Sequence, residues 1–252
     1  MAVISVAVYF GHYKLTKERI APVKKKKGDY NAFKTICDLA KNRPFVMLCL
    51  ASMQLIAFQF YYQSTYQYLF ADYYHSAKLY SMVTICTYLP MAILIPIMNK
   101  LIDKFGKKEL CAFGMGFAAI VSFVLFIIKT SNPYVFLAFT FFSGLGQTFL
   151  VLEVWALVMD VTDYQELLSG RREEGTTYSI YSFVRKLGQT AAGAGVPAVL
   201  GAIGYKGTQA VQSQQVLTKM FDAATIVPSV ILLLMFILTT FCYKLGLSLI
   251  HI

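Results

Sequence analysis

The chain has 252 residues, of which 57% are hydrophobic and 14% are charged, and it carries a formal net charge of +10. Soluble domains are about 45–50% apolar and about 25% charged, so the excess apolar surface is expected to face a lipid bilayer. The basic charge argues for membrane topology rather than for nucleic acid as a partner, because the lysines and arginines lie in short connections between long apolar runs.

Residues 1–13 form an apolar stretch that is too short to cross a bilayer, which takes about 20 residues. We expect this stretch to be the end of a preceding transmembrane helix. A basic linker follows at residues 14–43, and its segment 30–42 carries apolar side chains at helical spacing. That spacing predicts a short amphipathic helix at the membrane surface.

Six later segments are apolar and long enough to span the membrane, and lipid requires them to be helical because it cannot satisfy exposed backbone groups. They are residues 44–70, 79–98, 110–129, 134–159, 176–203 and 223–243. The expected fold is therefore an all-α membrane protein with a six-helix bundle at 44–246 and a tail at 247–252.

The basic residues also predict the orientation of the bundle. Most of the 23 lysines and arginines lie in the linker, in the connections after the second and fourth spans, and near the C-terminus. If all six segments span, these parts share one side, which is expected to be cytoplasmic. The chain is accordingly expected in the cell inner membrane.

The connection after the second span, residues 99–108, has an acid at Asp103, a glycine at Gly106 and lysines around them. It resembles the loop motif of the major facilitator superfamily, with Asn99 in place of the leading glycine. Asp103 can cap a helix or pair with a cation, and Gly106 permits a tight turn. We expect Asp103 to act in gating; a generic basic loop is the alternative.

A second segment, residues 160–205, is more specific. Its distinctive residues are Asp160, Asp163, Tyr164, Glu166, Gly170, Arg171, Arg172, Glu173, Glu174, Gly175, Tyr178, Ser179, Arg185, Lys186, Gly188, Gln189, Gly201, Gly204 and Tyr205. This pattern resembles the glycoside–pentoside–hexuronide:cation symporters of the major facilitator superfamily, and is most similar to their glucuronide carrier branch.

The resemblance covers essentially the whole chain, as the C-terminal half of a twelve-helix transporter. It implies transport of a sugar or glycoside, coupled to Na⁺ or H⁺ by alternating access, with no cofactor. It also implies that a missing N-terminal six-helix bundle is a partner, together with the lipid bilayer and the sugar. Such carriers hold most cation-binding acids in that N-terminal bundle.

The charged residues after the fourth span suit a gate whose ion pairs break and re-form as two bundles rock. The candidates are Asp163, Glu166, Arg171 and Arg172. A solvated loop with weak pairs is the alternative.

Arg185 and Lys186 lie inside the fifth predicted span, where a basic residue costs about 2.5–3.5 kcal/mol on insertion scales. They are expected to face a wet cavity that receives an anion; snorkelling to the interface is the alternative. In the family resembled, the lysine at the position of Lys186 is important for transport and lies close to the cation and sugar sites.

Tyr178, Ser182, Arg185 and Gln189 share one helical face, which suits a hydrated sugar path. Arg185 could bind a substrate carboxylate through two hydrogen bonds, and this favours a uronide such as a glucuronide.

Two further sets of polar residues lie inside predicted spans. Glu153 could pair with Arg185 or Lys186, could bind a proton or Na⁺, or could be purely structural. In the first span, one face carries Gln59, Tyr62, Gln63 and Tyr66, which can bind sugar hydroxyls and stack on pyranose rings. Interhelical hydrogen bonding or an interfacial tyrosine belt is the alternative for that face.

Two other functions stay open at this point. One is a half-length membrane protein that does not transport and only assembles with or regulates a partner. The other is a facilitator for another substrate class, such as a lipid or drug. Enzymatic activity has little support, because no candidate nucleophile–base pair or metal-ligand cluster is recognisable.

Overall fold

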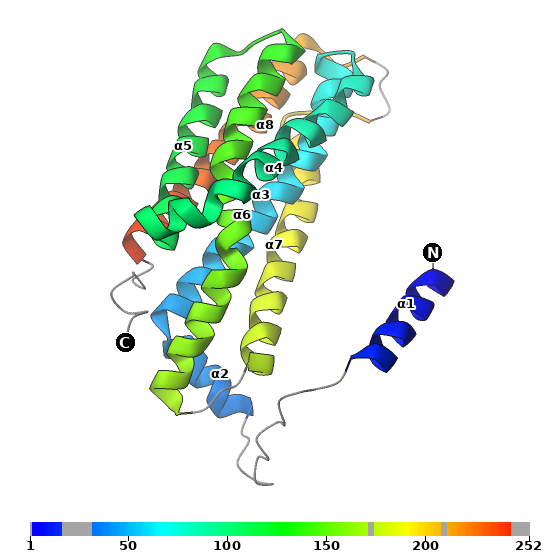
Figure 1. Cartoon of the computed structure of the whole chain (residues 1–252). Helices are drawn as coiled ribbons and strands as arrows, with labels where there is room; N and C mark the ends of the chain where they lie inside the picture. The colour runs from blue at the N-terminus through cyan, green and yellow to red at the C-terminus, as the bar shows by residue number, and fades with distance from the viewer. Residues whose placement is uncertain (1, 17–31, 171–173, 208–210, 243–252) are drawn as a thin grey trace. The chain divides into compact units, whose positions relative to one another are not determined.

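The computed structural model describes residues 2–16, 32–170, 174–207 and 211–242, and all regular structure in these residues is helical (Figure 1). The chain divides into two units, residues 1–34 and 35–252. The first unit contains α1 (Ala2–Leu15). The apolar stretch at the N-terminus is therefore helical, and its place at the end of a transmembrane helix stays a prediction.

The second unit is a bundle of long helices. In chain order, beginning with the helix that crosses the boundary between the units, its elements are α2 (Ala32–Lys41), α3 (Arg43–Tyr68), the π-helical turn η1 (Leu69–Tyr73), the 3-10 turn η2 (Ala77–Leu79), α4 (Tyr80–Phe105), α5 (Lys107–Ile128), α6 (Pro133–Ser169), α7 (Glu174–Ala202), α8 (Gln214–Ile237) and the π-helical turn η3 (Leu238–Cys242).

Five helical segments of the described chain have the length and apolar composition needed to cross a membrane. They are Arg43–Tyr73, Ala77–Phe105, Lys107–Ile128, Pro133–Ser169 and Gln214–Phe241. The expected all-α membrane fold is confirmed, and the protein is a multi-pass membrane protein. With 29 residues, α7 is long enough but not apolar enough to be counted with them, so a sixth crossing stays a prediction.

Several helices extend beyond the apolar runs that predicted them. The fourth predicted span ended at residue 159, whereas α6 continues to Ser169; the sixth began at 223, whereas α8 begins at Gln214. An apolar run marks the membrane core, but helical hydrogen bonding continues into the polar flanks. The predicted loop at 99–108 is likewise helical except at Gly106, where a positive φ of 90° separates α4 from α5.

Helix starts follow from short polar caps. Asn42 accepts a hydrogen bond from the backbone N–H of Phe45 at 3.1 Å and begins α3, while Asn132 accepts one from Tyr134 at 2.9 Å and begins α6. Asn42 also donates to Gln165 Oε1 at 2.7 Å. Both side chains are buried, so this contact fastens the start of α3 to the far end of α6.

The helices pack closely where glycines face each other. In the α5–α6 interface, a Cβ added to Gly114 would collide with the backbone oxygen of Gly146. A Cβ added to Gly146 would likewise collide with the backbone oxygen of Gly114. In the α3–α7 interface, Gly188 lies directly against the backbone oxygen of Met53. Figure 1 shows α7 running beside α3, in agreement with their many contacts. Two tight helix pairs therefore frame the bundle.

Candidate functional site

The polar face predicted in the fifth span is one side of α7. Tyr178 is 53% exposed, Arg185 and Gln189 are partly buried, and Lys186 is exposed. The Nζ of Lys186 donates a hydrogen bond to Gln189 Oε1 at 3.0 Å. Ser182, partly buried, lies between Tyr178 and Gln189 on the same face. The structure thus brings four polar residues and one aromatic residue together along a single helix.

A tryptophan from α6 joins this face. The guanidinium carbon of Arg185 lies 5.1 Å from the centre of the Trp155 ring and 5.6 Å from that of Tyr181. Trp155 also stacks on Tyr178 at 6.2 Å, with an interplanar angle of 26°. We call Trp155, Tyr178, Tyr181 and Arg185 the aromatic–arginine cluster. Sequence reasoning missed Trp155 as a site residue, because thirty positions separate it from Arg185 and no periodicity links them.

Arg185 has an aromatic environment rather than an acidic one. Among the residues that the structure describes, no carboxylate lies within 4.0 Å of its guanidinium. A guanidinium on aromatic faces keeps its N–H donors at its edges, because the rings attract its charge without using those donors. The cluster therefore holds a positive group that can still bind an anion.

The position of α7 is set by α3. Ser52 Oγ donates a hydrogen bond to the Tyr181 hydroxyl at 3.1 Å, and both side chains are buried. Close packing of Gly188 against Met53 lies two turns further along. These two contacts fix the rotation of α7, so its polar face keeps its direction without help from α6.

Glu153 lies deep in the bundle, with 6% of its surface exposed. Its Oε2 is buried and has no hydrogen-bond partner among the described residues. The charged groups that act on its carboxyl group are Lys107, on α5, and Asp160, on α6. No ion pair joins Glu153 to Arg185 or Lys186 in the described chain, so those residues do not neutralise it here.

An ion pair joins α5 to α6 near the polar end of α6. Lys107, the first residue of α5, donates to both carboxylate oxygens of Asp160, at 2.8 and 3.0 Å. The two side chains are 27% and 14% exposed. Sequence reasoning placed Lys107 in the loop motif and Asp160 in the second segment, but it did not pair them, because only the packing of α5 on α6 brings them together.

The gating candidates predicted from the sequence are distinct from this pair. Asp103 is exposed near the end of α4, and Asp163 and Glu166 lie on the last turns of α6. Arg171 and Arg172 fall outside the described residues, as do most of the basic linker and the tail. The gating role of all five stays a prediction.

The four polar residues of the first span separate into two kinds. Tyr62 and Tyr66 are 4% and 7% exposed, and their rings pack 5.5 Å apart in the bundle core, where Tyr66 also meets Phe136 at 4.8 Å. Gln59 and Gln63 stay partly accessible. The structure thus places the two tyrosines among buried aromatics, and the sugar-binding role of all four residues stays a prediction.

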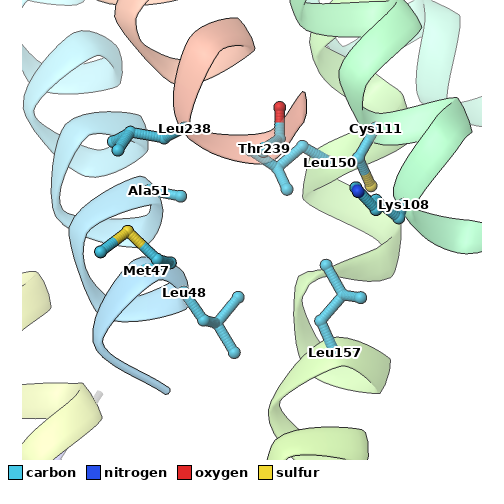
Figure 2. A pocket seen from close by; sticks show the side chains of 9 residues that line it. All are labelled: Met47, Leu48, Ala51, Lys108, Cys111, Leu150, Leu157, Leu238 and Thr239. Atoms are coloured by element: carbon cyan, nitrogen blue, oxygen red, sulfur yellow. The ribbon is translucent and has the colours of Figure 1, made fainter. Parts of the chain in front are cut away.

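A small crevice lies between α3, α5, α6 and η3 (Figure 2). Its volume is about 10 Å³, roughly the least that holds one water molecule. Apolar side chains surround it; the lining residues are Met47, Leu48, Ala51, Lys108, Cys111, Leu150, Leu157, Leu238 and Thr239. This crevice is too small and too apolar for a sugar, so the exposed face of α7 is the better candidate site.

Comparison with known proteins gives a family match across the chain. The model of the MFS/sugar transport protein family matches residues 1–246. The chain is 27% identical to the glucuronide carrier protein homolog of Escherichia coli K12 over 243 residues. This stretch is 96% of the chain and 52% of that relative.

Two other relatives match shorter stretches. The uncharacterized symporter YjmB of Bacillus subtilis 168 is 37% identical over 146 residues, 58% of this chain and 31% of the relative. The putative sulfoquinovose importer of Escherichia coli K12 is 31% identical over 179 residues, 68% of this chain and 37% of the relative. The chain thus spans about half the length, or less, of the curated relatives it matches.

Proposed function

The chain belongs to the family of MFS/sugar transport proteins, and from that premise we propose that it forms the C-terminal half of a carrier for an anionic sugar or glycoside. A uronide is the favoured cargo. The carrier works by alternating access and couples uptake to an ion gradient. The family is one of transporters, not of enzymes.

The main observation that supports this choice of cargo is the environment of the Arg185 side chain. A cation inside a bilayer is tolerated where it faces a wet cavity or meets an anion, and Arg185 has aromatic rings but no described carboxylate beside it. A carboxylate on the sugar supplies that anion through two parallel hydrogen bonds. Lys186, Gln189 and Ser182 offer groups for hydroxyls along the same face.

A sulfonated sugar is a second candidate cargo. The names of two relatives refer to anionic sugars, a glucuronide in one case and sulfoquinovose in the other. A sulfonate offers Arg185 the same charge with three acceptor oxygens instead of two. Comparing the uptake rates of a glucuronide and of sulfoquinovose in the same cells separates the two candidate cargoes.

The exposed face of α7 is proposed to meet an N-terminal six-helix bundle across the transport path. Lys186 and Tyr178 are exposed on the described chain, although an unpaired lysine inside the membrane is unfavourable against lipid. The glucuronide carrier protein homolog is about twice as long as the stretch that the chain matches. We call this chain together with such an N-terminal bundle the assembled carrier.

Glu153 is the proposed coupling residue of this half, and the proton is the proposed ion. The buried, unpartnered Oε2 can take a proton without other ligands, whereas Na⁺ needs several oxygen atoms around it. Titratable neighbours of Glu153 are Lys107, Asp160 and Cys111.

The Lys107–Asp160 pair is the proposed cytoplasmic gate, and a gating role is proposed as well for Asp103, Asp163, Glu166, Arg171 and Arg172. The proposed orientation has the basic connections inside the cell and the chain in the inner membrane. Single cysteines at Lys100 and Lys206, in a background without native cysteines, test the orientation. Impermeant maleimide should label Lys206→Cys in intact cells and Lys100→Cys only after lysis; the reverse pattern would invert the topology.

Uptake by the assembled carrier tests the cargo. Radiolabelled glucuronide and an uncharged glycoside are compared in wild type, Arg185→Gln and Lys186→Ala, with Lys219→Gln as the control for an exposed lysine on α8. Arg185→Gln should lower glucuronide uptake about 10- to 100-fold, the worth of a charged hydrogen bond, and neutral uptake far less. Lys186→Ala should abolish accumulation of both.

Equal loss of both cargoes in Arg185→Gln would contradict carboxylate binding by this residue. Ion coupling is measured in the same vesicles with proton and sodium gradients imposed separately. Glu153→Gln should keep exchange of cargo but lose accumulation driven by a proton gradient. Uptake driven by sodium alone would replace the proton in the proposal.

The non-transporting alternative has its own test. If the chain only assembles with or regulates a partner, removing it from the assembled carrier should leave basal transport by that partner intact. We expect instead that transport is lost with it. A facilitator for a lipid or drug would show no competition by glucuronide in the same assay.

A further inference from the structure

We propose that Trp155 is a positioning and specificity residue for the anionic group of the cargo. Its indole holds the Arg185 guanidinium in place, so that the guanidinium is oriented to receive a negative group. This inference rests on the proposed function and adds a residue of α6 to a site otherwise built on α7.

The contacts of Trp155 show why α6 matters to a site on α7. The indole meets Arg185 at 5.1 Å, Tyr178 at 6.2 Å and Tyr181 at 5.8 Å, and all three residues belong to α7. The backbones of α6 and α7 approach each other at few points, in contrast to the α5–α6 pair. The aromatic–arginine cluster is therefore a main bridge between the two helices.

The exposure of the cluster is graded from inside to outside. Tyr181 is fully buried and tied to α3, whereas Trp155 is 46% exposed and Tyr178 is 53% exposed. The Tyr181 end of the cluster is thus buried, and Trp155 and Tyr178 at the other end are about half exposed. A partly buried cation next to two half-exposed aromatic rings matches a ligand that brings a negative group.

The chemistry of the guanidinium decides what Trp155 contributes. A guanidinium has five N–H donors at its edges and none above its plane. An aromatic ring that attracts it restricts its motion, so a carboxylate meets the donors already arranged for two hydrogen bonds. Removing the ring leaves the charge but frees its orientation. The loss should therefore fall on anionic cargo and not on neutral cargo.

The second cation of α7 does not share this arrangement. Lys186 donates to Gln189 on its own helix and makes no cation–π contact with an aromatic ring of the described residues. Loss of Trp155 should therefore leave Lys186 and its transport role unchanged. Discrimination between charged and neutral cargo is then a property of the α6–α7 interface.

An interfacial tryptophan that only anchors α6 at the headgroup layer is the competing explanation. An anchor would affect membrane insertion or all cargoes alike. It would not distinguish a uronide from the matching neutral glycoside. Cargo charge is therefore the variable that separates the two explanations.

The test compares Trp155→Leu and Trp155→Tyr in the assembled carrier, with Phe142→Leu as the control for an exposed aromatic residue of α6. Initial uptake rates of glucuronide and of the matching neutral glycoside give KM and Vmax for each. Trp155→Leu should raise the glucuronide KM about tenfold, which corresponds to about 1.4 kcal/mol, with Vmax and the neutral KM nearly unchanged. Trp155→Tyr should restore most of the affinity.

A double substitution completes the test. In an Arg185→Gln background, Trp155→Leu should produce no further rise in the glucuronide KM, because its effect passes through Arg185. An additive effect, or an equal loss for neutral and charged cargo, would overturn the proposal. Wild-type glucuronide uptake with no response to Trp155→Leu would overturn this inference alone, whereas absence of wild-type uptake of both glucuronide and sulfoquinovose would overturn the proposed function as well.

Discussion

The two sides of α6 are built in opposite ways. Toward α5, small residues let the backbones touch at Gly114 and Gly146, and the Lys107–Asp160 ion pair is partly buried. Toward α7, large aromatic side chains bridge a wider separation, and Trp155 stays half exposed. One helix thus has a closely packed interface and an open one.

This difference indicates where the bundle can change and where it cannot. A glycine contact has no side chain that can rearrange, so any shift of α5 on α6 breaks it outright. Aromatic side chains can turn while the helices keep their places. The open α6–α7 interface is therefore the side suited to cargo, and the α5–α6 interface is the side that preserves the fold.

Adding a methyl group to the close-packed interface should have the largest effect on stability. In Gly114→Ala the new Cβ would meet Gly146 O and the Phe149 ring, so we expect a loss of about 2–3 kcal/mol in the free energy of unfolding. Gly193→Ala, whose Cβ meets nothing within 4 Å, is the matched control and should be neutral or slightly stabilising. Denaturant titration of the purified chain in detergent measures both; a similar response would remove the contrast.

Breaking the Lys107–Asp160 pair should rank second. Lys107→Ala leaves a carboxylate that is only 14% exposed without its partner, and we expect a loss of about 1–2 kcal/mol, discounted for the partial exposure of the pair. Lys129→Ala is the control, because Lys129 and Asp222 are 45% and 31% exposed and should lose at most about 0.5 kcal/mol. If both variants unfold alike, the buried side of α6 is not held by this ion pair.

The tie between the ends of α3 and α7 should rank third and should depend on pH. Tyr205 donates a hydrogen bond to Asp72 at 2.7 Å, and burial, followed by this contact, raises the pKa of Tyr205 to about 12. Since an unfolded tyrosine has a pKa of about 10, the stabilisation is complete below pH 10 and is lost as pH rises toward about 12.

Tyr205→Phe should therefore cost about 1 kcal/mol at neutral pH and remove its share of the alkaline loss. Tyr68→Phe, which keeps the ring that packs on Tyr205, is the control and should retain most of the pH dependence, because the Tyr68 charge is the smallest of the causes that raise the pKa of Tyr205. Unfolding of both variants between pH 8 and pH 12 measures the difference. An unchanged alkaline profile in Tyr205→Phe would mean that the hydrogen bond to Asp72 does not stabilise the fold.

The smallest effect on stability is expected in the open interface. Trp155→Leu should change the free energy of unfolding by less than about 1 kcal/mol, because the indole is half exposed and its contact with Arg185 is a single cation–π interaction. The same denaturant titration measures it. A loss as large as that of Gly114→Ala would show that the α6–α7 interface supports the fold as strongly as the α5–α6 interface, and the two sides would no longer differ in kind.

Local pattern was sufficient for much of this protein. Apolar runs predicted the long helices because lipid leaves the backbone no other way to satisfy its hydrogen bonds. Helical spacing placed Tyr178, Ser182, Arg185 and Gln189 on one face, as the structure has them. Both inferences depend on residues close to one another in the chain, where geometry follows directly from the helix repeat.

The contacts between helices could only come from the tertiary structure. Trp155 with Arg185, Lys107 with Asp160, and the burial of Tyr66 against Phe136 all join residues that are far apart in sequence. A helix repeat gives the direction of a side chain relative to its own axis, but not the rotation of that axis toward a neighbour. Packing of glycines and aromatic rings decides that rotation, and with it which polar face is left open for cargo.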